Sequence, residues 1–202
     1  MKDYFSVHFF VKDKIDESKT KKIIKEDKNI IISSYEDFKQ IPTEKYLAFE
    51  YSHGTEVYLH YDYDNLTCQV KTSSAKKIST IENFIESSSI KDNLEILNKQ
   101  VILKCMYSFD DNDMYVYSML FVEEMYSPCV YEMLNVVSEL SLSISPFLYK
   151  EFYLDGSFFL YEKLKSFTNE NSLMNSSRKI KGVFLVPVNS SFDIRKNYII
   201  LG

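Results

Sequence analysis

The sequence predicts an α+β protein with an antiparallel or mixed β-sheet, built from two β-meanders with interspersed short helices. Stretches that alternate apolar and polar residues, as half-buried strands do, recur in pairs joined by short polar turns. Ser-x-x-acid patterns, which cap helices, follow these pairs. Regular strand–helix–strand units, which a parallel α/β sheet needs, are few. With 202 residues and 45% hydrophobic residues, the chain fits a single domain over residues 1–202.

The N-terminal part predicts two strands and one short helix. Residues Tyr4–Val11 alternate strongly, which indicates a strand with one apolar face. Asn29–Ser33 has the composition of a short buried strand. Ser34 and Asp37 then form a capping-box pattern, which predicts a helix that Pro42 ends.

The first predicted meander lies between residues 45 and 71. The strands Lys45–Tyr51 and Thr55–Tyr63 flank a turn at His53-Gly54, and a further strand, Thr67–Lys71, follows. Two short helices are expected next, with their N-caps at Ser79 and Ser89.

The second predicted meander repeats this order. The strands Val101–Phe109 and Met114–Val122 flank an acidic turn, and Ser127-Pro128 opens a helix over Cys129–Leu142. The recurring ββα order suggests a duplication of residues 45–98 and 101–142. The chain then closes with a helix and two strands, Ser157–Phe167, Lys179–Val186 and Asn197–Leu201.

The composition favours a cytoplasmic protein. Its three cysteines, Cys68, Cys105 and Cys129, are odd in number and widely spaced, which fits a reducing compartment better than a disulfide framework or a zinc site. No secretory signal pattern is visible after Met1. The uncharged runs are too short to span a membrane, which takes about 20 residues. We therefore expect no membrane association.

One block of the chain carries most of the net charge of −5. Between Cys105 and Tyr149 there is no Lys, Arg or His, whereas seven Asp and Glu residues are present. A surface of one sign steers ligands of the opposite sign, so the block favours a basic protein partner and disfavours nucleic acid. The overall acidic balance, with a pI of about 5.3, also argues against a nucleic-acid binder.

The same block is rich in tyrosine, which is enriched at protein interfaces. The predicted partner-binding residues combine both features: Asp110, Asp111, Asp113, Tyr115, Tyr117, Glu123, Glu124 and Tyr126. The resulting hypothesis is a non-enzymatic protein-binding protein, such as an immunity or inhibitor protein that occludes a basic, nuclease-like toxin. The alternative is that the tyrosines belong to the core and the acids form a solvated face.

A second hypothesis is a metal-dependent enzyme. His60, Asp62 and Asp64 share one face of a predicted strand because side chains alternate along it. Imidazole and carboxylate groups are suitable ligands for divalent metals. The alternative is that these residues form the solvated face of a half-buried strand.

Other motifs are absent or incomplete. The four glycines are isolated, so no phosphate-binding loop is present, and no cofactor is predicted. The acidic turn at residues 110–113 lacks the ligand spacing of a calcium loop. Cys129 stands near a predicted helix start but has no histidine in a catalytic context, so it is interpreted as a small apolar residue. A structural subunit of a phage or mobile element is a third hypothesis, and the oligomeric state is not predicted.

Overall fold

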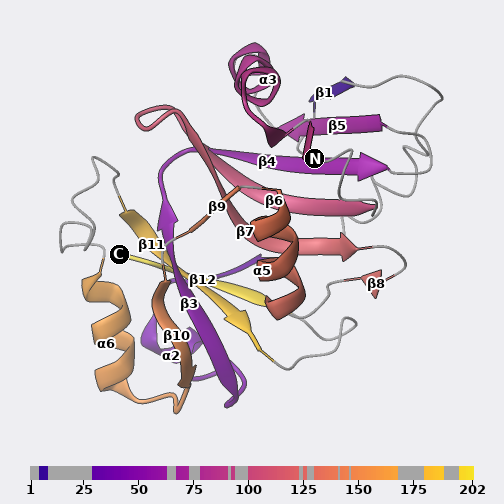
Figure 1. Cartoon of the computed structure of the whole chain (residues 1–202). Coiled ribbons are helices and arrows are strands. Elements are labelled where there is room, and N and C mark those ends of the chain that lie inside the picture. Colours follow the sequence, from indigo (N-terminus) through magenta and orange to yellow (C-terminus); the bar gives the residue numbers. More distant parts are fainter. Residues whose placement is uncertain are drawn as a thin grey trace. The chain divides into compact units, whose positions relative to one another are not determined.

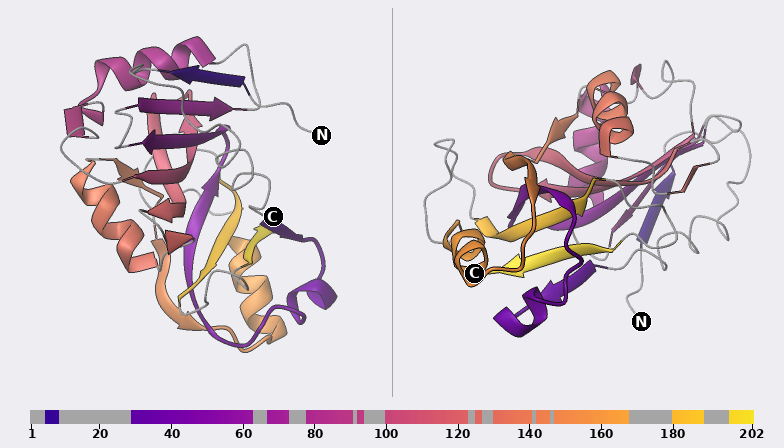
Figure 2. Two further views of the ribbon diagram at one scale, coloured as in Figure 1. Left: turned by 90° about the vertical axis from the view of Figure 1, so that its right-hand side faces the viewer. Right: turned by 90° about the horizontal axis from the view of Figure 1, so that it is seen from below.

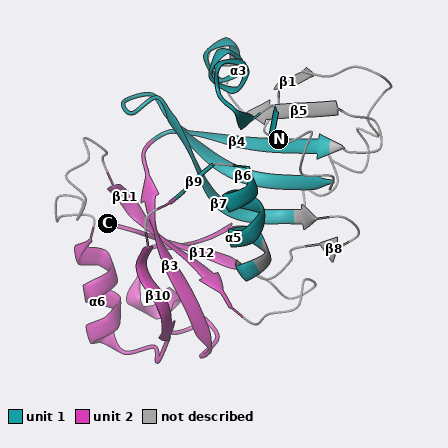
Figure 3. Ribbon diagram, viewed as in Figure 1, with its two compact units in different colours: residues 1–27, 54–144 teal, residues 28–53, 145–202 magenta. Residues whose placement is uncertain are grey.

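The computed structural model divides the chain into two compact units (Figure 3). Unit 1 comprises Met1–Asp27 and Gly54–Ile144, and unit 2 comprises Lys28–His53 and Ser145–Gly202. The structure describes residues 5–8, 29–62, 67–72, 78–90, 92–93, 100–122, 125–126, 130–140, 142–145, 147–167, 180–188 and 196–202. Each unit combines a mixed sheet with short helices, which confirms the predicted α+β class.

Unit 1 contains a seven-stranded sheet with the order β1-β5-β4-β6-β7-β8, and β9 pairs with β7 (Figure 1). Its strands are β1 (Phe5–His8), β4 (Thr55–Asp62), β5 (Thr67–Thr72), β6 (Val101–Ser108), β7 (Asp113–Val122), β8 (Met125–Tyr126) and β9 (Ser143–Ile144). The β7–β9 pair is parallel, whereas the other neighbouring strands of this sheet pair antiparallel. The predicted hairpin of the second meander, β6–β7, is therefore confirmed.

The helices of unit 1 are α3 (Ile78–Ser87) and α5 (Val130–Glu139). Ile81 and Ile85 of α3 are buried, and the Phe84 ring meets the ring of Tyr107 on β6 edge to face, 5.4 Å between centroids. The helix already begins at Ile78, so the predicted N-cap at Ser79 is wrong. Neither these helices nor any other helix of the described residues is long and apolar enough to cross a membrane.

Unit 2 contains a five-stranded sheet with the order β10-β3-β11-β12-β2. Its strands are β2 (Asn29–Ile32), β3 (Lys45–Ser52), β10 (Phe147–Tyr153), β11 (Ile180–Pro187) and β12 (Asn197–Leu201). The β12–β2 pair is parallel and the others are antiparallel. Two helices, α2 (Tyr35–Phe38) and α6 (Phe158–Ser166), lie against each other, and α6 also contacts β11 and β12 (Figure 2).

The first predicted meander is only partly correct. β4 and β5 form the expected antiparallel pair, but β3 pairs with β10 and β11, whereas β4 pairs with β5 and β6. The hairpin across His53-Gly54 is therefore wrong. A Cβ on Gly54 would lie 2.5 Å from the carbonyl oxygen of Tyr107, so this glycine lets the chain pass close to β6 instead of closing a turn. The single domain and the ββα duplication stay predictions.

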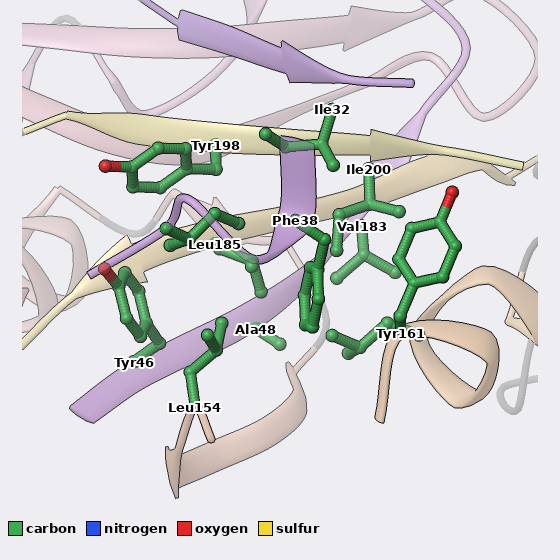
Figure 4. Close-up of a cluster of buried hydrophobic side chains, with 12 residues drawn as sticks. Ile32, Phe38, Tyr46, Ala48, Leu154, Tyr161, Val183, Leu185, Tyr198 and Ile200 are labelled. Carbon is green, nitrogen blue, oxygen red and sulfur yellow. The ribbon is translucent and has the colours of Figure 1, made fainter. Parts of the chain in front are cut away.

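The hydrophobic core of unit 2 lies between its sheet and its helices. Figure 4 shows Phe38 and Tyr161 reaching the side chains of β3, β11 and β12, and the two rings are 5.3 Å apart between centroids. Ala48 of β3 and Val183 of β11 face this core and are fully buried. Because side chains alternate along a strand, Phe49, Tyr51 and Phe184 lie on the opposite face of the sheet.

The predicted capping box at Ser34 is present and gives a pH-dependent prediction. Ser34 Oγ accepts a hydrogen bond from the Asp37 N–H at 3.1 Å, and the Asp37 carboxylate accepts one from the Ser34 N–H at 3.1 Å. The hydrogen bonds from Ser34 lower the pKa of Asp37 below its ordinary value. The carboxylate therefore stabilises the folded state above the ordinary pKa, and this contribution is lost as the pH falls through the lowered value.

We expect Ser34→Ala to lower the free energy of unfolding by about 0.5–2 kcal/mol near neutral pH, because the N-cap hydrogen bond is lost. The difference from the unchanged protein should shrink as the pH falls through the lowered pKa of Asp37, where its carboxylate becomes protonated. Urea denaturation at neutral and at acid pH measures this difference in stability. Ser166→Ala is the control, because this serine lies at the C-terminal end of another helix, at residues 158–166. A difference that grows toward acid pH would contradict the assignment.

Candidate functional site

The predicted acidic residues Asp110, Asp111 and Asp113 come together on the β6–β7 turn. Asp110 is exposed, whereas the Asp111 carboxylate accepts a hydrogen bond from the Tyr115 hydroxyl at 3.4 Å. The Asp113 carboxylate accepts one from Ser143 Oγ at 2.9 Å, which ties the turn to β9. Two of the three carboxylates therefore hold the turn in shape.

The predicted aromatic part of this surface is not exposed. Tyr115 and Tyr117 are only 7% and 2% exposed, so they belong to the core of unit 1, as the alternative interpretation had it. Tyr126 lies in β8, but its side chain is outside the described part, and so are Glu123 and Glu124 altogether. The tyrosines and aspartates of the described part thus do not form one mixed patch.

Tyr107 and Cys105, on the adjoining strand β6, are also taken up by the fold. Burial and the nearby Asp113 carboxylate raise the pKa of the Tyr107 hydroxyl, which donates a hydrogen bond to Asn112 Oδ1. Burial raises the pKa of the Cys105 thiol, so this cysteine is a protonated core residue. Cys129 lies outside the described residues.

The predicted metal site is described only in part. His60 lies on β4 and is 2% exposed, so it does not stand on a solvated face. Asp62 is the last residue of β4, with its side chain outside the described part, and Asp64 is outside it entirely. Among the residues that the structure describes, no three His, Cys, Asp or Glu side chains are grouped to hold a metal ion. Metal binding by these residues stays a prediction.

The sheet of unit 1 also holds a buried ion pair that sequence reasoning missed. Lys104 of β6 is directly opposite Tyr58 of β4, and its side chain is only 5% exposed. Lys104 Nζ lies 3.5 Å from Glu56 Oε2 and 5.5 Å from the centre of the Tyr58 ring. The Tyr58 hydroxyl donates a hydrogen bond to Glu56 Oε1 at 3.2 Å. The sequence signal is one lysine within the apolar run of β6.

This ion pair has a structural role in unit 1. A charge taken out of water is costly unless an opposite charge and hydrogen bonds compensate it. Glu56 supplies the charge, and the Tyr58 ring adds a cation–π contact. The ion pair thus allows β6 to carry a lysine at a buried position of the sheet.

Unit 2 presents a different arrangement on the sheet face opposite its core. The rings of Tyr51 on β3 and Phe184 on β11 are nearly parallel, 21° apart, with their centroids at 6.4 Å. Lys181 Nζ lies over the Tyr51 ring, 5.9 Å from its centre. Lys181 is exposed, Tyr51 is partly buried, and Phe184 is almost fully buried. We call these three residues the Tyr51 platform.

Gly182 shapes the Tyr51 platform from β11. It is the register partner of Tyr51, and a Cβ at this position would lie 2.2 Å from the carbonyl oxygen of Ile200 on β12. The close approach of β12 therefore requires glycine here. As a result, β11 places no side chain directly opposite Tyr51. An aromatic ring beside a lysine is a combination that can stack on a planar ligand and attract its negative charge.

The arrangement of the sheets and helices can be compared with known structures. An RNA ligase of Naegleria gruberi, a lysine-to-alanine variant with ATP and Mn, matches with a TM-score of 0.59 and 13% identity, over 83% of this chain and 52% of that chain. The same ligase with PPi matches with a TM-score of 0.58 and 13% identity, over the same shares of the two chains. In its fold, the chain resembles an RNA ligase.

A third structure of the ligase, a lysine-to-methionine variant with AMP and Mn, gives a TM-score of 0.57 and 14% identity, again over 83% of this chain and 52% of the other. The chain thus spans about half the length of the ligase structures. No protein-family model matches it, and no curated protein does. At this identity the likeness is one of fold.

This likeness corrects the functional hypothesis. The prediction of a non-enzymatic immunity or inhibitor protein is wrong, because the fold resembles that of an RNA ligase. The error came from counting charges along the chain. The count over Cys105–Tyr149 treats buried and exposed residues alike, although Tyr115 and Tyr117 lie in the core.

Proposed function

We propose that this chain is a nucleotidyltransferase-like protein that binds a nucleoside triphosphate. The observation that carries the proposal is the fold it shares with RNA ligase structures that contain ATP, AMP or PPi. When ATP is split between its first and second phosphates, AMP and pyrophosphate result. The three ligands are therefore a substrate and its two parts. ATP is therefore the first ligand to test.

The proposal concerns nucleotide binding and, beyond it, transfer of the nucleotidyl group. The chain spans only about half of the ligase, so joining of RNA ends is not carried over to it. Two of these ligase structures also contain Mn, but the described residues of this chain do not provide a set of three metal ligands. No step of the proposal therefore depends on a metal. The cytoplasmic location predicted from the cysteines fits a protein that uses ATP.

Equilibrium dialysis of the purified full chain with each of the four ribonucleoside triphosphates tests the binding step. AMP and inorganic pyrophosphate serve as part-ligands, and each arm is run with and without Mn²⁺. We expect saturable binding of at least one triphosphate, tighter than the binding of pyrophosphate. Failure to bind any of the four triphosphates at about millimolar concentration, where the binding free energy is about −4 kcal/mol, overturns the proposal.

Intact-mass spectrometry of the same samples tests the transfer step. A nucleophile on the protein would attack the first phosphate and release pyrophosphate, so the protein would gain the mass of one nucleoside monophosphate. Peptide mapping would then locate the acceptor. Saturable binding without any gain in mass would restrict the function to nucleotide binding and overturn covalent transfer.

A further inference from the structure

We propose that β2 (Asn29–Ile32), at one edge of the unit 2 sheet, is a dimerisation strand that pairs antiparallel with β2 of a second copy of this chain. β2 is the last strand in the order β10-β3-β11-β12-β2, and β12 is its neighbour on one side. Within the part of the chain that the structure describes, no strand pairs with the other side of β2. The backbone N–H and C=O groups on that side can therefore receive a further strand. This inference goes beyond nucleotide binding and does not depend on it.

The first argument is the regularity of the β2 edge. The strand keeps one register with β12 over all of its residues, from Asn29 opposite Asn197 to Ile32 opposite Ile200. It contains no charged residue and no proline. Proteins prevent pairing at exposed edges with charged side chains, prolines or β-bulges. β2 has none of these devices.

The opposite edge of the same sheet does have them. β10 pairs with β3 through two register shifts, and its residues Lys150 and Glu151 are exposed. An added strand would meet an irregular backbone and two charged side chains there. The sheet is thus protected against pairing at β10 but not at β2.

The second argument is the position of Ile31. Because side chains alternate along a strand, Ile30 and Ile32 point toward the core of unit 2, where Ile32 is only 2% exposed (Figure 4). Ile31 points to the opposite face and is 57% exposed. A partner strand that covers Ile31 would remove this apolar surface from water.

The third argument is that the residues of β2 complement a second copy of the same strand. Two antiparallel copies related by a two-fold axis at residue 31 place Ile31 opposite Ile31 and Ile30 opposite Ile32. The same register places Asn29 opposite Ser33, which is exposed. Apolar residues thus meet apolar residues, and polar residues meet polar ones. An axis at residue 30 would instead place Asn29 opposite Ile31 and is disfavoured.

Sedimentation equilibrium of the purified full chain tests the association. Because β2 has only four residues, the interface is small, and we expect a weak dimer with a dissociation constant of about 10–300 µM. The mean mass should rise over this range from that of one chain toward that of two. A mass that stays that of one chain up to about 1 mM overturns the inference. Slow amide exchange of β2 in such a single chain would mean that another segment of the chain covers this edge.

Ile31→Lys should weaken the dimer by about tenfold or more, because two ammonium groups would then face each other across the two-fold axis. Tyr153→Lys is the matched control, because Tyr153 lies on the other edge strand and is 61% exposed, close to the 57% of Ile31. This control should leave the dissociation constant unchanged. Equal weakening by both substitutions would show a general effect of added charge and would overturn the inference.

Cross-linking with a short bis-maleimide tests the register. Two copies of Ile31→Cys should cross-link readily, because directly opposite residues have Cβ atoms about 4.5–5.5 Å apart. Ser33→Cys should cross-link poorly, because its two copies would be four residues, roughly 13 Å, apart along the strands. The unchanged protein, with its three cysteines, gives the background. Cross-linking of Ser33→Cys as fast as that of Ile31→Cys would contradict the pairing and overturn the inference.

Discussion

Replacing Lys104 by methionine should lower the free energy of unfolding by about 3 kcal/mol, at the low end of the range for breaking a buried ion pair. Methionine fills a similar volume but removes the ammonium group that lies 3.5 Å from Glu56 Oε2. The Glu56 carboxylate then remains largely buried without its cation. Its side chain is still 22% exposed and keeps the hydrogen bond from Tyr58, and for this reason we expect the low end. Chemical denaturation measures the change.

Two variants provide the controls for this prediction. Glu56→Gln combined with Lys104→Met removes both charges, so it should cost less than Lys104→Met alone. Lys39→Met breaks the exposed pair with Glu36, which should change stability by less than about 1 kcal/mol. A double variant that is less stable than the single one would show that the ion pair is not the reason for the loss.

Local patterns in the sequence predicted most of the elements. The capping box at Ser34 is confirmed in both of its hydrogen bonds, because it depends only on residues three positions apart. The alternating runs that become β6, β7 and β11 were placed to within about two residues, the usual uncertainty of element ends. These features are set by side chains within a few residues of one another.

Features that depend on distant partners were not predictable in the same way. The residues around His53-Gly54 have the composition of a hairpin turn, but β3 and β4 find partners far away in the sequence, and no local signal distinguishes these outcomes. β10 was missed because Phe147–Tyr153 begins in a long uncharged run without clear alternation. The pairing of strands that are far apart in the sequence is visible only in the three-dimensional structure.

The candidate sites show the same limit. Asp110, Asp111 and Asp113 are neighbours in sequence, so their shared turn could be predicted. Tyr51 and Lys181 come together only because β3 pairs with β11. Their types alone, a tyrosine and a lysine in different parts of the chain, give no reason to connect them. Residues that are brought together by strand pairing can be recognised only once the fold is known.

Replacing Phe38 by alanine should lower the free energy of unfolding by about 3–5 kcal/mol, the usual cost of deleting a buried aromatic ring. Phe38 is fully buried and ends the four-residue helix α2, whose place in unit 2 depends on this ring and its contact with Tyr161 (Figure 4). Denaturation should give the size of the loss. Phe159→Ala is the matched control, because that ring is 77% exposed and its removal should cost little.

Amide hydrogen exchange can show where the Phe38→Ala variant is weakened. The amides of β3 and β11 should lose protection before those of β6, because the cavity lies in the core of unit 2 and strands open in local cooperative units. Equal loss of protection in β6 and β11 would mean that the two units unfold as one.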